Sequence, residues 1–263
     1  MSIPFAQLSF PELYEQALVQ PLFRPFAEAM IDELAVKPGD RVLDVACGTG
    51  IVARLAHARV GPHVVGVDVS PPMVAMARQV APSIDFREGD AASLPLHAGE
   101  VFDVVACHQG FQFFPDRAAA AQEMRRALAP GGRVAVATWR DDVEYPFLRA
   151  LRAVVERHVG TIADRRHSLH DQNELTNALR AGGFADVRVS KVERTVRFSD
   201  GQVFVRLNAM ALIGMSANAR DMTETERDRA MSLIMAESQD VLQSQSDTPE
   251  LAYELGTNIA IAT

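Results

Sequence analysis

The sequence predicts an open α/β fold, and three observations lead to that class. Residues 42–56 have the pattern of a buried strand, a glycine turn and a helix, because an apolar run ends in Asp44 and passes through small residues into helix-forming ones. Apolar runs of strand length recur at 64–68 and 102–108, with helical patterns between them. The 263 residues are enough for one large domain, or for one domain with a lid over its site.

The turn after the first strand indicates a ligand site. Gly48 and Gly50 let the backbone bend sharply and let a ligand approach where a Cβ would collide. With Ala53 they also fit the G-x-G-x-x-G/A dinucleotide fingerprint, so the glycines alone do not identify the ligand. Asp44 favours a cationic ligand, because a carboxylate beside the turn attracts an ammonium or sulfonium group and offers nothing to a pyrophosphate.

Two further acids follow the next two predicted strands. Asp68 closes the second strand 18 residues after Gly50, where an acid is placed to bind both ribose hydroxyls of an adenosine. Asp90 closes the third strand in the same way. Met73 lies in the helix that the Ser-Pro-Pro sequence at 70–72 starts, and two interpretations stay open for it: a thioether under the adenine ring, or ordinary core packing.

The remaining elements are predicted from periodicity, caps and helix breakers. A Pro-Gly-Gly stop at 130–132 ends one helix, Asp171 is expected to cap another, and a capping box at Thr223 and Glu226 opens a long one. The expected elements are short helices at 12–19 and 26–34, a strand at 102–108, a helix at 118–128, a strand at 133–139, helices at 144–159 and 173–181, a strand at 187–198, helices at 203–215 and 223–243, and a last strand at 254–263.

Together, these motifs resemble class I S-adenosylmethionine (SAM)-dependent methyltransferases. The stretch Asp44-x-Ala46-Cys47-Gly48-x-Gly50 resembles motif I of that family. Phe-Asp-Val-Val at 102–105, Phe-Pro-Asp at 114–116 and Leu-x-Pro-Gly-Gly-x-Val at 128–134 are similar to members of the ubiquinone/menaquinone-biosynthesis type, and the resemblance covers about residues 10 to 140. It implies a Rossmann-like seven-stranded sheet in the order 3-2-1-4-5-7-6, with an antiparallel last strand, helices on both faces and a helical lid insertion.

The resemblance also implies SAM as the cofactor and S-adenosylhomocysteine (SAH) as its product. In that family the acid at Asp90 receives the adenine amino group, and the backbone amide of Ala91 meets the ring. His108 ends the fourth strand, where the family brings the methyl group near its acceptor, so it is the candidate base; alternatively it only contacts cofactor or backbone. The cofactor-binding set implied by the resemblance is Tyr14, Asp44, Ala46, Cys47, Gly48, Gly50, Asp68, Val69, Met73, Asp90, Ala91 and His108.

The resemblance divides the chain into five segments. They are an N-terminal helical cover at 1–35, a SAM-binding core at 36–140, a lid helix with the sixth strand at 141–201, a helical lid insertion at 202–250 and the last core strand at 251–263. The insertion carries five methionines that suit either an adaptable apolar lid over the substrate or plain core packing, namely Met210, Met215, Met222, Met231 and Met235. His167 and His170 have the spacing of a metal pair without an evident third ligand, so we expect a solvated loop and no metal site.

Composition narrows the function classes. The net charge is −8 and no Lys/Arg run occurs, so the electrostatic signature of nucleic-acid binding is missing. No apolar run approaches the roughly 20 residues of a membrane span. Two cysteines make no disulfide framework, which favours the cytoplasm, and a homodimer is left open.

We therefore expect methyl transfer from SAM to an oxygen, nitrogen or carbon atom of a small, apolar or aromatic acceptor molecule. The glycine pattern and Asp68 also permit a nicotinamide-dependent oxidoreductase, although Asp44, Asp90 and the block at 130–132 disfavour it. A third hypothesis is a non-catalytic SAM-binding regulator, which only an activity assay excludes.

Overall fold

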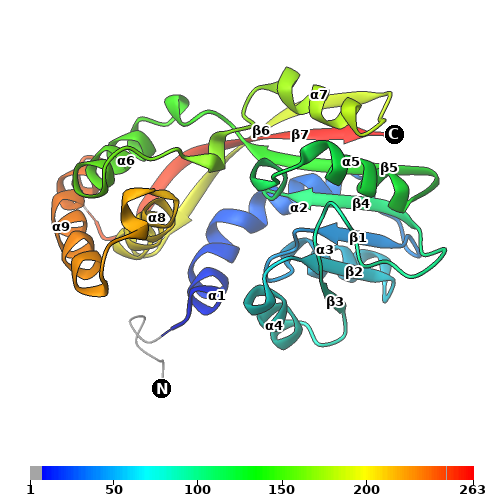
Figure 1. The fold of residues 1–263 in the computed structure, drawn as a ribbon, viewed down its shortest axis with the longest axis horizontal. Coiled ribbons are helices and arrows are strands. Elements are labelled where there is room, and N and C mark those ends of the chain that lie inside the picture. The colour runs from blue at the N-terminus through cyan, green and yellow to red at the C-terminus, as the bar shows by residue number, and fades with distance from the viewer. Residues whose placement is uncertain (1–7, 247) are drawn as a thin grey trace.

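The computed structural model describes residues 8–246 and 248–263, and its centre is a seven-stranded sheet in the order β3-β2-β1-β4-β5-β7-β6 (Figure 1). The neighbours from β3 to β5 are parallel, whereas β7 runs antiparallel to both β5 and β6. The predicted sheet is confirmed. Its strands are β1 (Val42–Val45), β2 (Val64–Asp68), β3 (Asp85–Glu88), β4 (Phe102–His108), β5 (Leu128–Trp139), β6 (Val187–Phe198) and β7 (Leu251–Ala262).

Strand β5 begins earlier than the sequence predicts. It starts at Leu128 rather than at 133, so it includes the Pro-Gly-Gly stop. The pairing of β4 with β5 shifts register between Phe102 and Val104, and Gly131 has a φ of 76°, a value that side chains rarely allow. The stop therefore ends the preceding helix, as predicted, and then forms an irregular start of the strand.

Helices cover both faces of the sheet, as predicted. Side chains alternate along the strands, so that Ala135 and Ala137 of β5 join one buried cluster while Val134 and Val136 join the other. A sheet covered on both faces leaves its strand ends as the accessible edge for a ligand. The first face carries α2 (Arg24–Glu33), α3 (Ile51–Val60) and α4 (Pro71–Val80), and the second carries α5 (Arg117–Ala127) and α7 (Gln172–Ala181).

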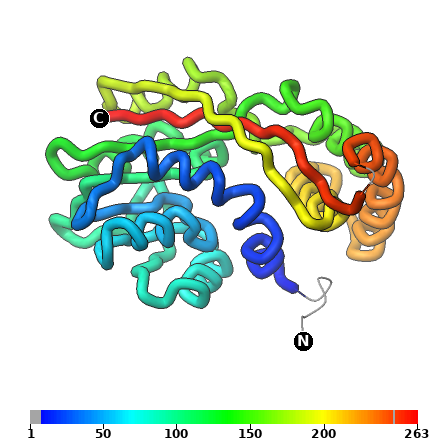
Figure 2. Tube along the Cα trace, turned by 180° about the vertical axis from the view of Figure 1, so that it is seen from behind, coloured from blue at the N-terminus to red at the C-terminus, as the bar shows by residue number. Residues whose placement is uncertain are grey.

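A group of helices lies beyond the end of β6 and the start of β7 (Figure 1). It consists of α6 (Pro146–Val159), α8 (Gly201–Met215) and α9 (Glu224–Gln243), which pack on one another. The segment formed by α1 (Phe10–Leu13) and the π-helix η2 (Tyr14–Phe23) runs between this group and the sheet (Figure 2). Short 3₁₀ turns are η3 (Phe111–Phe113), η4 (Asp142–Glu144), η5 (Arg165–His167) and η6 (Asn218–Arg220).

The predicted helix caps are present. The carboxylate of Asp171 accepts hydrogen bonds from the backbone N–H groups of Asn173 and Glu174, at 2.7 and 3.0 Å, so α7 begins after it. Thr223 and Glu226 form the reciprocal capping box that opens α9. These short-range signals are therefore reliable here, because each is satisfied within one helical turn.

The methionines of the predicted lid pack mainly inside the helical group. Met215, Met222 and Met231 lie against the buried cluster between α6, α8 and α9, and Met235 lies against the neighbouring aromatic cluster. Met210 lines a separate groove between α8 and α9. This packing supports core contact rather than a methionine lid over the substrate.

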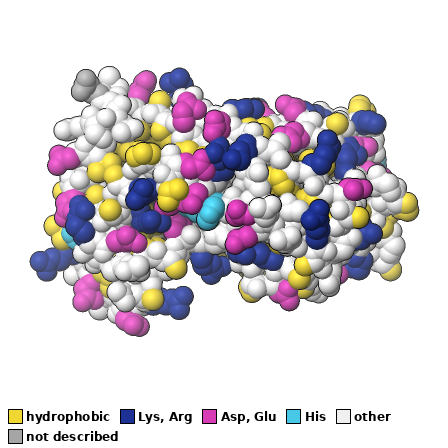
Figure 3. Space-filling view, turned by 90° about the horizontal axis from the view of Figure 1, so that it is seen from above, with side chains coloured by type: hydrophobic (Ala, Val, Ile, Leu, Met, Phe, Trp, Pro, Cys, Tyr) yellow, Lys and Arg dark blue, Asp and Glu magenta, His cyan; other side chains and the backbone are white. Residues whose placement is uncertain are grey.

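The surface carries both signs of charge. Lys and Arg side chains are interspersed with Asp and Glu side chains over the face shown in Figure 3. Among the residues that the structure describes, no helix combines the length and the apolar character that crossing a bilayer requires. The N-terminal segment and the helical group bury apolar side chains against the rest of the chain.

Deleting residues 251–263 should unfold the protein rather than trim a tail. Strand β7 is bonded on both sides, to β5 and to β6, and Ile259 and Ala260 on it are fully buried. We expect no cooperative thermal unfolding transition and little soluble product, measured by circular dichroism. Removing Thr263 alone, which lies beyond β7, is the control. A folded, SAH-binding truncation would contradict the interior position of the strand.

Candidate functional site

The turn between β1 and α3 is held open by glycines in left-handed conformations. Gly48 has a φ of 56° and Gly50 a φ of 86°, values that a residue with a side chain rarely adopts. A Cβ on Gly50 would lie 2.6 Å from the ring of Phe86, so only glycine fits there. A Cβ on Gly48 would point toward Tyr14, whose hydroxyl oxygen would be 3.8 Å away. Tyr14 therefore covers the turn.

Asp44 presents an unpaired carboxylate oxygen beside this turn. Its Oδ2 accepts a hydrogen bond from the backbone N–H of Ala53 at 2.9 Å, whereas its buried Oδ1 has no partner among the described residues. Burial raises the pKa of Asp44 to about 8; the bond from Ala53 opposes this effect and the charge of Asp68 adds to it. A cationic group fits this site, because an ammonium would supply the missing partner for the buried oxygen.

Asp68 ties the end of β2 to the same turn. One carboxylate oxygen accepts the N–H of Gly48 at 2.8 Å, and the other accepts the N–H of Ser70 at 2.9 Å. Burial raises the pKa of Asp68, and the two backbone bonds lower it. Each oxygen keeps a second lone pair, so a carboxylate that is already fixed in position can accept two ribose hydroxyls. The next residue, Val69, is 68% exposed and offers apolar surface that a purine ring would cover.

Asp90 lies at the same edge of the sheet. Because β1, β2 and β3 are parallel neighbours, their carboxyl ends and the acids at or near these ends meet there. Asp90 is exposed, and its Oδ1 accepts the N–H of Ala92 at 2.8 Å. Met73 is half-buried in the first turn of α4. The structure thus brings the three predicted acids to one edge, with Asp68 between the other two.

The N-terminal π-helix links the turn to the end of β4. Tyr14 stacks on Phe23 with ring centroids 4.9 Å apart, and Phe23 meets the ring of His108 edge-on at 6.3 Å. An ion pair between Glu15 and Arg54, at 2.9 Å, fastens the π-helix to α3. The chain segment that covers the turn therefore also reaches the predicted place of methyl transfer.

The two cysteines pack on opposite faces of the sheet. Both are free and buried, Cys47 in the cluster against α3 and Cys107 in the cluster against α5. The carbonyl of Cys47 accepts the N–H of Gly50 at 2.8 Å. Cys47 thus shapes the turn through its backbone, while its thiol packs in the core.

His108 is buried at the end of β4 and does not line the aromatic cavity between the N-terminal helices and α8. Its Nε2 has no partner among the described residues, and burial lowers the pKa of His108 to about 3. A general base must hold the proton that it removes, and a site that disfavours imidazolium this strongly holds it poorly. The environment favours a contact role for His108, and its role as base stays a prediction.

An aromatic cavity lies between the N-terminal helices and α8. It has a volume of about 290 Å³, and its predominantly apolar lining is typical of sites for small organic molecules. Tyr14 and Phe23 line it, so the cavity adjoins the covered turn. Its other aromatic residues are Phe10, Phe113, Trp139, Phe204 and Tyr253; its aliphatic residues are Leu18, Leu22, Leu148, Leu207, Ala211 and Leu255; its polar residues are Gln109, Arg166, His167 and Asn208.

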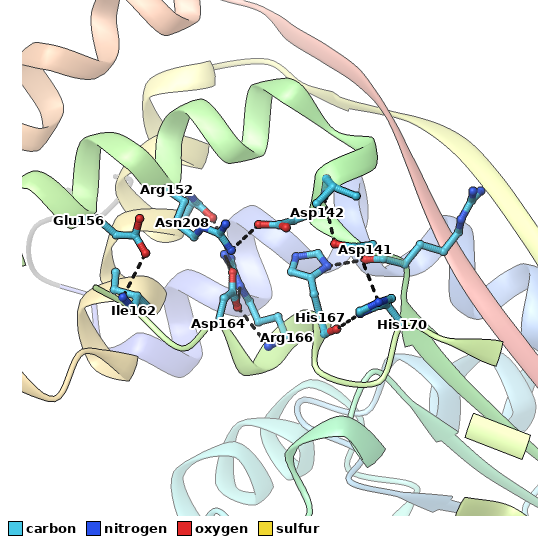
Figure 4. Close-up of polar contacts among 12 residues, drawn as sticks. Asp141, Asp142, Arg152, Glu156, Ile162, Asp164, Arg166, His167, His170 and Asn208 are labelled. Carbon is cyan, nitrogen blue, oxygen red and sulfur yellow. Dashed lines mark hydrogen bonds and ion pairs between the residues drawn. The ribbon is translucent and has the colours of Figure 1, made fainter. Parts of the chain in front are cut away.

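Three of the polar lining residues make hydrogen bonds in two adjacent groups, which we call the polar network of the cavity (Figure 4). Arg166 pairs with Asp164 through two bonds of 2.8 and 2.6 Å, and its Nη1 donates to Oδ1 of Asn208 at 2.7 Å. The Nδ1 of His167 lies 2.5 Å from the backbone oxygen of Arg140. Burial lowers the pKa of His167, so its ring is neutral near pH 7.

This network is not predicted from the sequence. The predicted solvated loop is wrong for His167, because this residue is only 9% exposed and lines the cavity. The Nδ1 of His170 lies 2.7 Å from the backbone oxygen of His167, and its Nε2 lies 3.3 Å from the carboxylate of Asp141. No group of three metal-ligating side chains occurs in residues 8–246 and 248–263. One signal was available: Asn208 stands alone among apolar residues in the middle of a helix, and buried polar side chains usually have partners.

Comparisons with known proteins agree with the motifs. A family profile described as a methyltransferase domain matches residues 43–136. Nocamycin O-methyltransferase from Saccharothrix syringae is 33% identical over 208 residues, which are 70% of this chain and 72% of that protein. Demethylmenaquinone methyltransferase from Renibacterium salmoninarum is 32% identical over 178 residues, 62% of this chain and 74% of that protein. These matches favour the methyltransferase prediction over the nicotinamide-dependent oxidoreductase.

A solved structure shares the fold. Phosphoethanolamine N-methyltransferase 2 from Haemonchus contortus, solved in complex with S-adenosyl-L-methionine, matches with a TM-score of 0.56 at 18% identity. The match covers 97% of this chain and 55% of that chain. At this identity the likeness supports the fold alone.

The buried carboxyl of Asp44 predicts a pH dependence of stability. Its pKa is about 8 in the folded protein and near 3.8 in an unfolded chain, so ionising it opposes folding increasingly as the pH rises through that interval. The Asp44→Asn variant lacks this penalty. The difference in the free energy of unfolding, variant minus wild type, should therefore rise by several kcal/mol as the pH increases from 3.8 to about 8. Urea denaturation measures it, with Asp186→Asn, at an exposed position, as the control. A difference that does not change with pH would refute the assignment.

Proposed function

The chain belongs to the class I SAM-dependent methyltransferases of the small-molecule type, and we propose that its acceptor is an apolar or aromatic molecule bound in the cavity between the N-terminal helices and α8. When bound, SAM supplies a methyl group on a positively charged sulfur. The residues of the chain hold the acceptor in line with that methyl and keep water away. One observation carries the proposal: the aromatic cavity and the glycine turn share Tyr14.

We assign the cofactor to the edge formed by the turns after β1, β2 and β3. The unpaired Oδ1 of Asp44 suits the ammonium group of SAM, and the fixed carboxylate of Asp68 suits the ribose hydroxyls. Asp90 suits the adenine amino group. The remaining proposed contacts are the turn backbone at Ala46, Cys47, Gly48 and Gly50, the adenine surroundings at Val69, Met73 and Ala91, and the covering side chains Tyr14 and His108.

The end of β4 lies between the proposed sites of the cofactor and the acceptor. Gln109 has a φ of 57° and turns its side chain to the cavity, where its Nε2 donates to the hydroxyl oxygen of Thr257 at 2.9 Å. The preceding His108 faces Phe23. The names of the two relatives, an O-methyltransferase and a demethylmenaquinone methyltransferase, support a small-molecule acceptor. Buried free thiols at Cys47 and Cys107 support a reducing compartment, and we propose the cytoplasm.

Calorimetric titration with SAH, with NAD as the comparison, tests the cofactor assignment. Only SAH should bind. At pH 7 its binding should also release close to one proton, because the free protein holds Asp44 protonated and the ligand ammonium favours the carboxylate. Titrations in buffers of different ionisation enthalpy count the proton. Asp44→Asn should bind SAH more weakly and release none, whereas equal proton release from this variant would show that another group titrates.

Narrowing the cavity should impair the acceptor and spare the cofactor. Ala211 lies on the cavity side of α8, so Ala211→Phe should raise the KM for the acceptor about tenfold or more while leaving SAH affinity unchanged. Transfer from labelled SAM to a panel of phenols, quinols and amines identifies the acceptor and then measures the KM. Arg206→Phe, at an exposed position of the same helix, is the control. SAH binding without transfer to any acceptor would favour the non-catalytic regulator.

A further inference from the structure

The polar residues of the cavity have their hydrogen-bonding roles fixed before any acceptor binds. The amide oxygen of Asn208 accepts from Nη1 of Arg166 at 2.7 Å. This bond fixes the orientation of the amide, because a guanidinium can only donate. The NH₂ group of Asn208 is therefore free to donate, because it has no hydrogen-bond partner among the described residues. Asn208 lines the cavity and thus offers a donor to its contents.

Arg166 orients the side chain of Asn208 and is not available to bind an anionic ligand. Its Nε and Nη2 bond to the two oxygens of Asp164, at 2.8 and 2.6 Å, so the positive charge is already matched. The side chain of Asp164 is itself almost fully buried. Replacing this ion pair by a bond to an anionic ligand would leave a buried carboxylate alone, which is costly. The recognition group is the neutral amide.

His167 offers the complementary group. Its Nδ1 lies 2.5 Å from the backbone oxygen of Arg140, which can only accept, so Nδ1 carries the proton and Nε2 presents a lone pair. Arg140 is held in turn by ion pairs with Glu144 and Glu193. Burial lowers the pKa of His167, the hydrogen bond to the Arg140 carbonyl and the charges of Asp164 and Asp142 raise it, and the charge of Arg166 lowers it. Burial dominates and keeps the ring neutral, but the carbonyl and the two carboxylates would stabilise an imidazolium here, whereas at His108 burial acts alone.

A purely structural network would satisfy its own donors and acceptors. Here Nδ2 of Asn208 and Nε2 of His167 have no hydrogen-bond partner in the described part of the chain, and both belong to residues that line the cavity. They are also close in the fold, because Arg166 precedes His167 in the chain and bonds to Asn208. The cavity therefore offers a donor from Asn208 and an acceptor from His167 within its aromatic lining, which also carries the hydroxyl groups of Tyr14 and Tyr253.

We propose that this pair selects an acceptor whose hydroxyl group neighbours a second oxygen, as in a catechol or a hydroxyquinone, and that the methyl group goes to that hydroxyl oxygen. His167 takes the hydroxyl proton at Nε2, and Asn208 donates from Nδ2 to the second oxygen. The inference rests on the proposed function, because it takes this cavity as the acceptor site.

The proton and the charge are balanced in this step. The hydroxyl oxygen forms the bond to the methyl carbon as the methyl–sulfur bond breaks, and the electron pair of that bond stays on sulfur. The hydroxyl proton moves to Nε2, so the positive charge lost at sulfur reappears on the imidazolium of His167. The other proton stays on Nδ1, which donates to the Arg140 carbonyl throughout, and water takes the transferred proton from Nε2 when the product leaves.

Three coloured probes test the inference by binding alone. 4-Nitrocatechol has two neighbouring hydroxyl groups, and 4-nitrophenol has a single hydroxyl. 4-Nitroanisole has no hydroxyl, because its only oxygen substituent besides the nitro group is a methoxy group. Each is titrated into the full chain saturated with SAH, at a pH below the probe's own pKa. We expect 4-nitrocatechol to bind about tenfold more tightly than 4-nitrophenol, the effect of one added hydrogen bond, and 4-nitroanisole to bind most weakly. Ionisation of bound 4-nitrocatechol should appear as the visible absorbance of its anion.

Two conservative variants separate the roles. Asn208→Asp keeps an acceptor for Arg166 and removes the donor, so it should abolish the preference for 4-nitrocatechol over 4-nitrophenol. His167→Asn keeps a donor for the Arg140 carbonyl and removes Nε2, so bound 4-nitrocatechol should stay neutral. Asn218→Asp makes the same change as the first variant at an exposed position and should behave as wild type. Unchanged thermal unfolding and SAH affinity in all three variants exclude a folding defect.

The outcomes distinguish this inference from the proposed function. Equal binding of all three probes by wild type, or wild-type spectra from both variants, would overturn the inference. If SAH binds and labelled methyl appears only on amine or carbon acceptors, the proposed function stands and the inference falls. If SAH fails to bind, the proposed function falls, whatever the probes show.

Discussion

The site depends on one hydrogen bond between neighbouring strand ends. The amide of Gly48 donates to Asp68 at 2.8 Å and so joins the left-handed turn after β1 to the end of β2. The other oxygen of Asp68 holds the amide of Ser70, which starts α4. On the opposite side of the turn, Asp44 holds the amide of Ala53 in the first turn of α3. Two carboxylates thus fix two helix starts, and any ligand in the turn meets backbone that cannot shift independently.

The two halves of the site are assembled in different ways. The proposed cofactor half comes from strand ends within residues 44–91, where parallel pairing brings the acids to one edge. The acceptor half needs the N-terminal helices, the end of β4, α8 and the start of β7. Long-range bonds hold these parts together; Gln109 and Thr257, 148 residues apart, meet at 2.9 Å. The cofactor half is therefore local in the sequence, while the acceptor half is a product of tertiary packing.

That difference explains how much could be predicted from the sequence. The strand order, the antiparallel β7, the caps at Asp171 and Thr223 and the edge position of Asp44, Asp68 and Asp90 all follow from patterns within a few residues or from the family resemblance. The environment of His167 does not, because its burial depends on packing between segments far apart in the chain. The early start of β5 was missed because glycine and proline signal a stop whether they end a helix or enter a strand irregularly.

The proposed acceptor half would discriminate between molecules through the polar groups that it leaves without partners. An apolar wall alone separates related molecules poorly, because a missing or added methylene changes binding by only about 1–3 kcal/mol. Fixed polar groups discriminate more strongly than an apolar wall. The donor on Asn208 is fixed by the bond to Arg166, and the acceptor on His167 is fixed by the bond to the Arg140 carbonyl. A molecule that cannot engage them buries two polar groups without partners and is rejected for that reason. Since both groups are oriented before binding, the matching acceptor loses little free energy in ordering them. In our proposal, the specificity for the acceptor depends on the bonds that orient Asn208 and His167 as much as on the aromatic side chains around them.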